Sequence, residues 1–264
     1  MPEAHDGPHS PYFTVLPIQG NANLAGWTSA GSGQDSGILG MSPEMAAALK
    51  AAPGGYCVCW GIPFEIGDGI VLSDAPVSID INPVKARWLV FLHTSDIRPL
   101  QPGPGGIISP MRGRGMLAEH AADYVICFTD GSQARASIRR RHQVGAFQRG
   151  WGENCFESVA HHKPYPLRAA HEQLSDSWGN SQARNFAGDD SAWVNWLWAW
   201  ENPLPEKAIA GFQFVPASGV VVLSAISAGN LASLPLRWQT RRKAFLALPV
   251  GESFQPEMDQ DGLL

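Results

Sequence analysis

Residues 193–200 (WVNWLWAW) place four tryptophans in eight positions, and this density limits what the chain can fold into. On a β-strand, Trp196 and Trp198 share one face, and the opposite face, which carries Trp193 and Leu197, is also largely apolar. Two apolar faces are typical of a central strand that is covered on both sides. A sugar-stacking platform and a membrane anchor are the alternatives, but an anchor needs a neighbouring apolar span that the sequence lacks. We predict that most of these rings pack in a core, while one or two reach a groove.

Turn-forming residues are frequent, since 28 Gly and 21 Pro among 264 residues favour many turns over long helices. Short β-branched or aromatic runs alternate with these turns, and Asp130-Gly131 between two such runs is a strong hairpin signal. The pattern predicts an all-β fold, specifically an antiparallel β-sandwich. The expected strands lie at 56–66, 69–72, 76–81, 87–94, 123–132, 134–139, 208–216 and 219–229.

One short helix is expected near 43–52. Ser42 can cap it, and Pro43 suits its first position. We expect a single β-sandwich domain over residues 1–248, followed by a polar tail or linker over 249–264.

Two long excursions, 97–121 and 149–190, interrupt the strand pattern, and loops of this length in a compact domain are often functional. The second excursion collects aromatic, carboxylate, amide, imidazole and guanidinium side chains. These groups could line a polyol pocket, with an indole stacking on a sugar ring and polar groups bonding its hydroxyls. An ordinary polar loop that covers one sheet is the alternative. The candidate ligand-binding residues are Trp151, Glu153, Asn154, His161, Trp178, Arg184 and, from the first excursion, Arg112.

The charge of the chain and the lack of targeting segments limit the classes of partner that we expect. The formal net charge of −5 argues against nucleic acid as the main partner. No apolar run approaches the roughly 20 residues of a membrane span, so we expect no membrane association. The start of the sequence shows no secretion signal, and a cytoplasmic location is the default expectation.

Cys57 and Cys59 lie two positions apart on an expected strand, which places their side chains on one face, roughly 7 Å apart. That spacing is poor for a disulfide, so reduced, mostly buried thiols are expected. His161-His162, with His171 and Glu153, could bind a metal, but no ligand spacing supports it, and we expect neither a metal nor a cofactor.

Four stretches carry a resemblance: WGIPFEIGDG (60–69), RWLVFLHTSD (87–96), ADYVICFTDGS (122–132) and WLWAWENPLPEKAIAGFQFVP (196–216). Their order resembles the galactose-binding-like, jelly-roll β-sandwich domains attached to bacterial carbohydrate-active enzymes and metallohydrolases. The resemblance runs from about Gly40 to Gly229 and implies such a sandwich beside a catalytic domain.

His93 lies near the end of the second stretch and is followed by Thr94, Ser95 and Asp96, but a histidine bonded within the core is favoured over a catalytic pair. We expect a non-catalytic, carbohydrate-recognising or accessory module with a saccharide, a C-terminal catalytic domain or a second copy as its partner. The alternatives are a hydrolase whose site lies in 97–121 and 149–190, and a structural or oligomerising domain.

Overall fold

The computed structural model describes residues 9–23, 40–98, 115–148, 154–161, 192–236 and 247–253. About half of these residues belong to β-strands, and one short helix, α2 (Pro43–Ala48), continues into a 3₁₀ turn (Leu49–Ala51). The strands are β1 (Phe13–Leu16), β2 (Ala22–Asn23), β3 (Gly55–Cys59), β4 (Ile62–Ile66), β5 (Asp68–Leu72), β6 (Val77–Val84), β7 (Trp88–Ser95), β8 (His120–Phe128), β9 (Gln133–Arg139), β10 (Ser158–Ala160), β11 (Trp196–Glu201), β12 (Ile209–Pro216) and β13 (Val221–Gly229).

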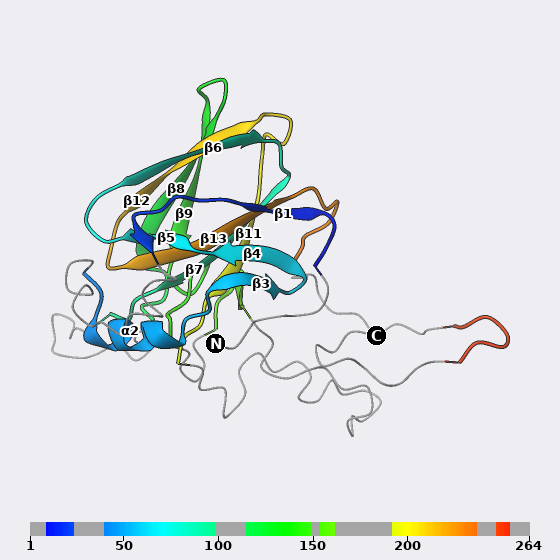
Figure 1. Cartoon of the computed structure of the whole chain (residues 1–264), viewed down its shortest axis with the longest axis horizontal. Helices are drawn as coiled ribbons and strands as arrows, with labels where there is room; N and C mark the ends of the chain where they lie inside the picture. The colour runs from blue at the N-terminus through cyan, green and yellow to red at the C-terminus, as the bar shows by residue number, and fades with distance from the viewer. Residues whose placement is uncertain are drawn as a thin grey trace.

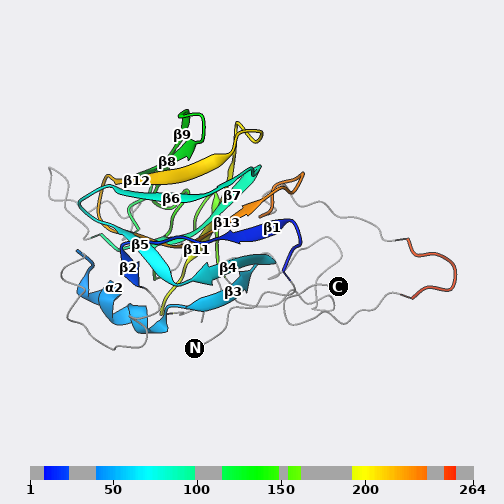
Figure 2. The ribbon, with the colours of Figure 1, turned by 45° about the horizontal axis from the view of Figure 1, so that its top comes forward.

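The strands form three layers. The middle layer, here called the central sheet, has the order β10-β11-β7-β13-β5-β2, and β1 also pairs with β13. The outer sheet has the order β6-β12-β8-β9, and β3 pairs with β4 in a separate hairpin. Figures 1 and 2 show the central sheet between the outer sheet on one side and the β3–β4 hairpin with α2 on the other. All pairings between these strands are antiparallel, so the prediction of an all-β sandwich is confirmed.

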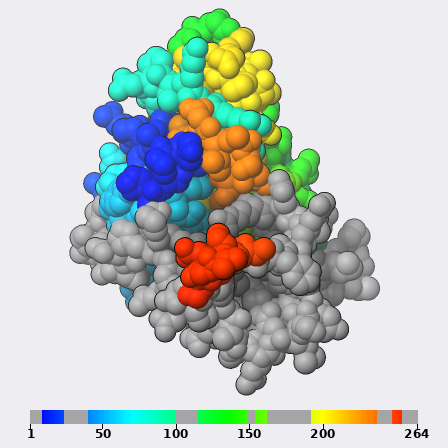
Figure 3. Space-filling model, turned by 90° about the vertical axis from the view of Figure 1, so that its right-hand side faces the viewer, coloured from blue at the N-terminus to red at the C-terminus, as the bar shows by residue number. Residues whose placement is uncertain are grey.

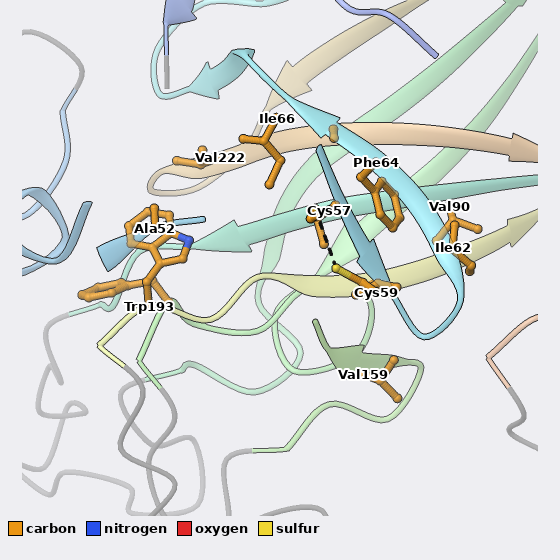
Figure 4. Packing of buried hydrophobic residues seen from close by; sticks show 14 of the residues in the cluster. Ala52, Cys57, Cys59, Ile62, Phe64, Ile66, Val90, Val159, Trp193 and Val222 are labelled. Carbon is orange, nitrogen blue, oxygen red and sulfur yellow. Dashed lines mark hydrogen bonds between the residues drawn. The ribbon is translucent and has the colours of Figure 1, made fainter. Parts of the chain in front are cut away.

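The central sheet is apolar on both faces because each face covers a different core. In β7, Leu89 and Phe91 pack with the outer sheet, whereas Val90 and Leu92 pack toward the β3–β4 hairpin. Figure 4 shows this second core, in which Phe64 and other hairpin side chains meet the central sheet. Every residue of β7 and of β13 is buried. A strand with this burial pattern needs apolar side chains at consecutive positions rather than at alternate ones.

The tryptophan-rich stretch also packs its rings into cores on both faces of the central sheet. Trp198 packs in the core under the outer sheet, Trp193 packs in the core under the hairpin, and Trp196 packs in a small third cluster beside Cys155. All three rings are buried, and Trp200 is partly buried. The prediction that most of these rings form core is confirmed.

The helix begins where the sequence indicates. The Ser42 side chain accepts a hydrogen bond from the Met45 N–H at 3.1 Å, which satisfies one of the free amides of the first turn. Asp96, at the end of β7, fixes this cap from the other side: its carboxylate accepts bonds from the Ser42 N–H at 2.6 Å and hydroxyl at 2.7 Å.

Two turns show where the strand predictions held and where one failed. Asp130 and Gly131 form the β8–β9 turn, with Gly131 at a φ of 82°, as predicted. The run 56–66, predicted as one strand, instead folds back at Trp60-Gly61 into β3 and β4. Both turn residues have positive φ, 56° and 77°, which a two-residue hairpin turn requires.

Two further points concern the chain as a whole. The predicted tail over 249–264 lies mostly outside the described residues, and residues 247–253 carry no helix or strand. In the part of the chain that the structure describes, no helix has the length and apolar character to span a bilayer.

Candidate functional site

The two ends of the central sheet differ in what they offer to solvent. At one end β7 begins and β11 and β13 stop, since Trp88 is opposite both Glu201 and Gly229. At the other end β7 stops at Ser95 beside the start of β13, and the cap of α2 lies against Asp96. We call these the hollow end and the capped end. In Figure 1, α2 marks the capped end, and it lies on the opposite side of the ribbon from the β8–β9 turn.

The hollow end contains a polar cavity of about 460 Å³. Three chain segments line it: the turn between β6 and β7, the last residue of β11 with the segment that follows it, and the residue that follows β13. Figure 3 faces this side, where segments coloured blue, cyan, yellow and orange adjoin on one surface. The lining residues are Lys85, Arg87, Glu201, Asn202, Pro205, Glu206 and Asn230.

Two asparagines hold these segments together. The buried Asn202 amide donates to the carbonyls of Ala86 at 2.9 Å and Leu204 at 3.2 Å. The Asn230 side-chain oxygen accepts from the Arg87 N–H at 2.9 Å, and its amide donates to the Lys85 carbonyl at 3.4 Å. Because both side chains bond backbone groups of the β6–β7 turn, the walls of the hollow are fixed relative to one another.

The charged side chains of the hollow are exposed and balanced. The Arg87 guanidinium donates from Nη2 at 2.9 Å and from Nε at 3.2 Å to Glu201 Oε1, and the two side chains are 43% and 53% exposed. Lys85 and Glu206 are exposed, and among the described residues neither side chain has an ion-pair or hydrogen-bond partner. The hollow therefore presents cationic donors and anionic acceptors in equal number.

Tyr12, an exposed aromatic residue, is bonded through its backbone to a residue that lines this hollow. The Asn230 N–H donates to the Tyr12 carbonyl at 3.1 Å, which extends the β1–β13 register by one residue beyond Phe13 and Gly229. Directly opposite residues of an antiparallel pair project to the same face, with Cβ atoms roughly 5 Å apart. Tyr12 is 59% exposed and is thus the neighbour of a residue that lines the hollow.

The capped end uses its polar groups internally. His93 is buried, and its two ring nitrogens contact Tyr124 Oη at 2.8 Å and the Gln143 carbonyl at 2.9 Å. Since a carbonyl only accepts, His93 Nε2 carries the proton and Nδ1 accepts from the Tyr124 hydroxyl. Burial lowers the pKa of His93 to about 4 and raises the pKa of Tyr124. Both side chains are neutral at pH 7, and the prediction of a histidine bonded within the core is confirmed.

An ion pair is buried at the same end. Arg140 Nε lies 2.9 Å from Glu119 Oε2, while its other nitrogens donate to the Asp96 carbonyl at 2.7 Å and the Ser218 carbonyl at 2.9 Å. Burial lowers the pKa of Arg140 to about 10, and the nearby Glu119 carboxylate opposes that shift. The side chain therefore stays charged at pH 7 and ties three chain segments together.

Five of the predicted ligand residues lie outside the described residues: Trp151, Glu153, Trp178, Arg184 and Arg112.

The structure places the other two beside β10. Asn154 is half-buried, whereas His161 is buried, with its Nδ1 accepting from the Asn195 N–H at 3.2 Å. That nitrogen is thus already used within the protein. Between them, the exposed Phe156 ring contacts His142, with ring centroids 5.1 Å apart.

The residues of the hollow were not predicted. Each lies at or near the end of a strand, and Asn202-Pro203, Pro205 and Asn230 read in the sequence as ordinary turn residues. The available signal was the clustering of Asn and Pro at several strand ends, which does not indicate that those ends meet.

Within the described ranges, no group of three or more His, Cys, Asp or Glu side chains is arranged to hold a metal ion. No protein-family model matches this chain, and no curated protein matches it in sequence.

Proposed function

We propose that this chain is a non-catalytic, carbohydrate-recognising β-sandwich module that binds a neutral saccharide at its hollow end. The observation that carries the proposal is the exposed Tyr12 opposite Asn230, beside a hollow whose charged groups balance. A saccharide has a C–H face that packs on an aromatic ring and a rim of hydroxyls, each of which both donates and accepts hydrogen bonds.

The charges of the hollow favour a neutral ligand. Arg87 and Glu201 neutralise one another, which leaves Lys85 to donate and Glu206 to accept. An acidic sugar would bring its carboxylate near two glutamates, and a basic one would bring its amine near Lys85 and Arg87. Hydroxyl groups meet both kinds of side chain without a net repulsion.

The volume of the hollow is large enough for a small glycan. A volume of about 460 Å³ falls in the usual range of ligand pockets, roughly 300–1,000 Å³. Its walls are held by Asn202 and Asn230, so a ligand would meet a preformed surface and lose little affinity to rearrangement of the protein.

The sequence resemblance to galactose-binding-like domains supports the same proposal, because such jelly-roll domains accompany bacterial carbohydrate-active enzymes. On this basis we propose an accessory role beside a catalytic domain. A shared fold does not by itself define a ligand, so the hollow, rather than the fold, is what an experiment has to address.

The test is a glycan array probed with the purified chain, followed by calorimetric titration of the best-bound saccharide. The Tyr12→Ala protein should remain folded and lose at least about tenfold in affinity, the equivalent of ~1.4 kcal/mol. Tyr56→Ala is the matched control, since Tyr56 is also exposed but lies on β3 in the hairpin layer. Array binding by no saccharide, or equal affinities for the two variants, would refute the proposal.

A further inference from the structure

Two cysteines face one another inside the hairpin core. Cys57 and Cys59 are both buried on β3, and their sulfur atoms lie 3.9 Å apart (Figure 4). The spacing of roughly 7 Å expected from the sequence describes where the side chains leave the backbone, and in the structure the two side chains converge from there. Rotation about the two Cα–Cβ bonds changes the distance between the sulfur atoms, and it is the movement by which the two thiols can approach one another.

The backbone spacing is compatible with a covalent bond. Two residues along a strand advance by about 6.6 Å, and disulfides occur at Cα separations up to about 6.8 Å. A bond across this distance is close to the upper limit, so we expect it to be more readily reduced than an ordinary structural disulfide.

The two cysteines lie outside the central sheet. Among the described residues β3 pairs with β4 alone, in a two-stranded hairpin. The Trp60-Gly61 turn, with positive φ at both residues, follows Cys59 directly. A two-stranded hairpin opens locally more easily than a central strand of a larger sheet, which gives a small oxidant access to buried sulfur.

The surroundings favour an uncharged product. The two thiols belong to an apolar cluster that includes Phe64, Ile66 and Val222. A bound metal ion would need charged thiolates in that cluster, and an isolated charge in an apolar site is strongly disfavoured. A disulfide carries no charge and has nearly the volume of two thiols.

The remaining cysteines lie in other parts of the structure. Cys127 is on β8 in the outer sheet, where its sulfur accepts from the Gln133 amide at 3.7 Å. Cys155 packs in the small cluster with Trp196. Both are natural controls for oxidation that depends on thiol chemistry alone.

We propose that Cys57 and Cys59 are a redox pair that peroxide converts to an intrachain disulfide. One sulfur attacks a peroxide oxygen, forms a sulfenic acid and releases one water molecule; the second sulfur then displaces a second water molecule as the S–S bond forms. Two thiols and one hydrogen peroxide thus yield one disulfide and two water molecules. A dithiol reductant reverses the change. The proposal is independent of saccharide binding.

The test is peptide mass analysis of the full chain. Cleavage after Lys50 and Lys85 releases residues 51–85, which contain Cys57 and Cys59 and no other cysteine or methionine. After mild peroxide treatment of the folded protein, this peptide should lose the mass of two hydrogen atoms and regain it with dithiothreitol. The thiol titre of the denatured chain, which has four cysteines, should fall to two.

Matched variants complete the experiment. Cys57→Ser and Cys59→Ser should each abolish the oxidised peptide, while Cys127→Ser and Cys155→Ser should leave it unchanged. The proposal is overturned if the wild-type peptide keeps its reduced mass, or gains only oxygen, under peroxide that oxidises free dithiothreitol completely. It is also overturned if Cys57 or Cys59 bonds instead to Cys127, Cys155 or a second chain.

Discussion

Both ends of the sandwich carry an arginine–glutamate ion pair, and the two pairs have the same shortest N–O distance of 2.9 Å. Arg87 and Glu201, at the hollow end, are 43% and 53% exposed, whereas Arg140 and Glu119, at the capped end, are 1% and 20% exposed. The first pair is exposed to solvent and adds little to stability. The second pair is largely removed from water, so its charges are stabilised by the protein groups around them.

The comparison extends to the other polar groups. At the capped end, His93, Asp96 and Arg140 are bonded by other protein groups. At the hollow end, the amides of Asn202 and Asn230 bond backbone, but Lys85 and Glu206 point their charges to solvent. Polar groups that the fold itself does not use are available for a ligand, so the hollow end is the stronger candidate for recognition.

The largest effect is expected in the strand that joins the two ends. Trp198 is buried and stacks on Phe91 at 5.6 Å between ring centroids. Removal of a buried tryptophan typically costs ~3–5 kcal/mol, so Trp198→Ala should lower the free energy of unfolding by that amount in urea denaturation. An unchanged unfolding midpoint together with lost saccharide binding would make Trp198 part of a binding platform instead.

A loss of similar size is expected from the buried ion pair. Arg140→Met keeps the apolar stem and removes the guanidinium, which leaves Glu119 Oε2 without its cationic partner and the carbonyls of Asp96 and Ser218 without their donor. Breaking one partner of a buried pair costs ~3–5 kcal/mol. Urea denaturation at pH 7 measures the loss in the free energy of unfolding. A loss below about 1 kcal/mol would show that water replaces the guanidinium, and the ion pairs at the two ends would then contribute similarly to stability.

The buried histidine predicts a pH dependence at the capped end. The pKa of His93 is lowered to about 4 in the folded chain from an ordinary value of 6.5. The unfolded chain therefore takes up the proton first, so stability falls as the pH drops below about 6.5, and the loss is complete below about 4. The total amounts to roughly 3 kcal/mol.

His93→Gln removes the titrating group, so its stability should change less between pH 7 and pH 4 than that of the wild type. Denaturation curves at several pH values give the change of the free energy of unfolding with pH for each protein, and this change can be compared whatever the absolute stability of the variant. Asp130, whose pKa is lowered by its bond to Lys207, titrates in both proteins and cancels in the comparison. Parallel slopes would contradict a neutral buried His93.

The smallest effect is expected at the hollow end. Arg87→Met removes the exposed ion pair with Glu201 and should change the free energy of unfolding by no more than ~1 kcal/mol. The same denaturation protocol as for Arg140→Met makes the two results directly comparable. A loss as large as that of Arg140→Met would mean that the hollow is a structural element rather than an available surface.

Local patterns in the sequence predicted a good part of the fold. The two apolar faces of the tryptophan-rich strand, the Asp130-Gly131 turn and the Ser42 cap each depend on neighbouring residues. The core-bonded His93 was expected from the sequence resemblance. The hairpin turn at Trp60 was missed because a bulky residue rarely adopts a positive φ.

The candidate site was not predicted, for a physical reason. Its walls come from residues near 85, 201 and 230, which only the sheet order brings together. Similarly, the hydrogen bond that the Ser42 hydroxyl donates to the Asp96 carboxylate joins residues 54 positions apart. Turn residues at a strand end indicate the turn itself, but they carry no information about which other turns lie beside it.

The most direct test of the account is a map of amide chemical shifts in the ¹⁵N-labelled chain during titration with the saccharide selected on the array. We predict that the shifted signals cluster at Lys85 to Arg87, at Glu201 to Glu206 and at Asn230, while the signals of residues 154–161 stay in place. Shifts confined to residues 154–161 and their neighbours at the capped end would contradict the account and return the binding function to the second excursion.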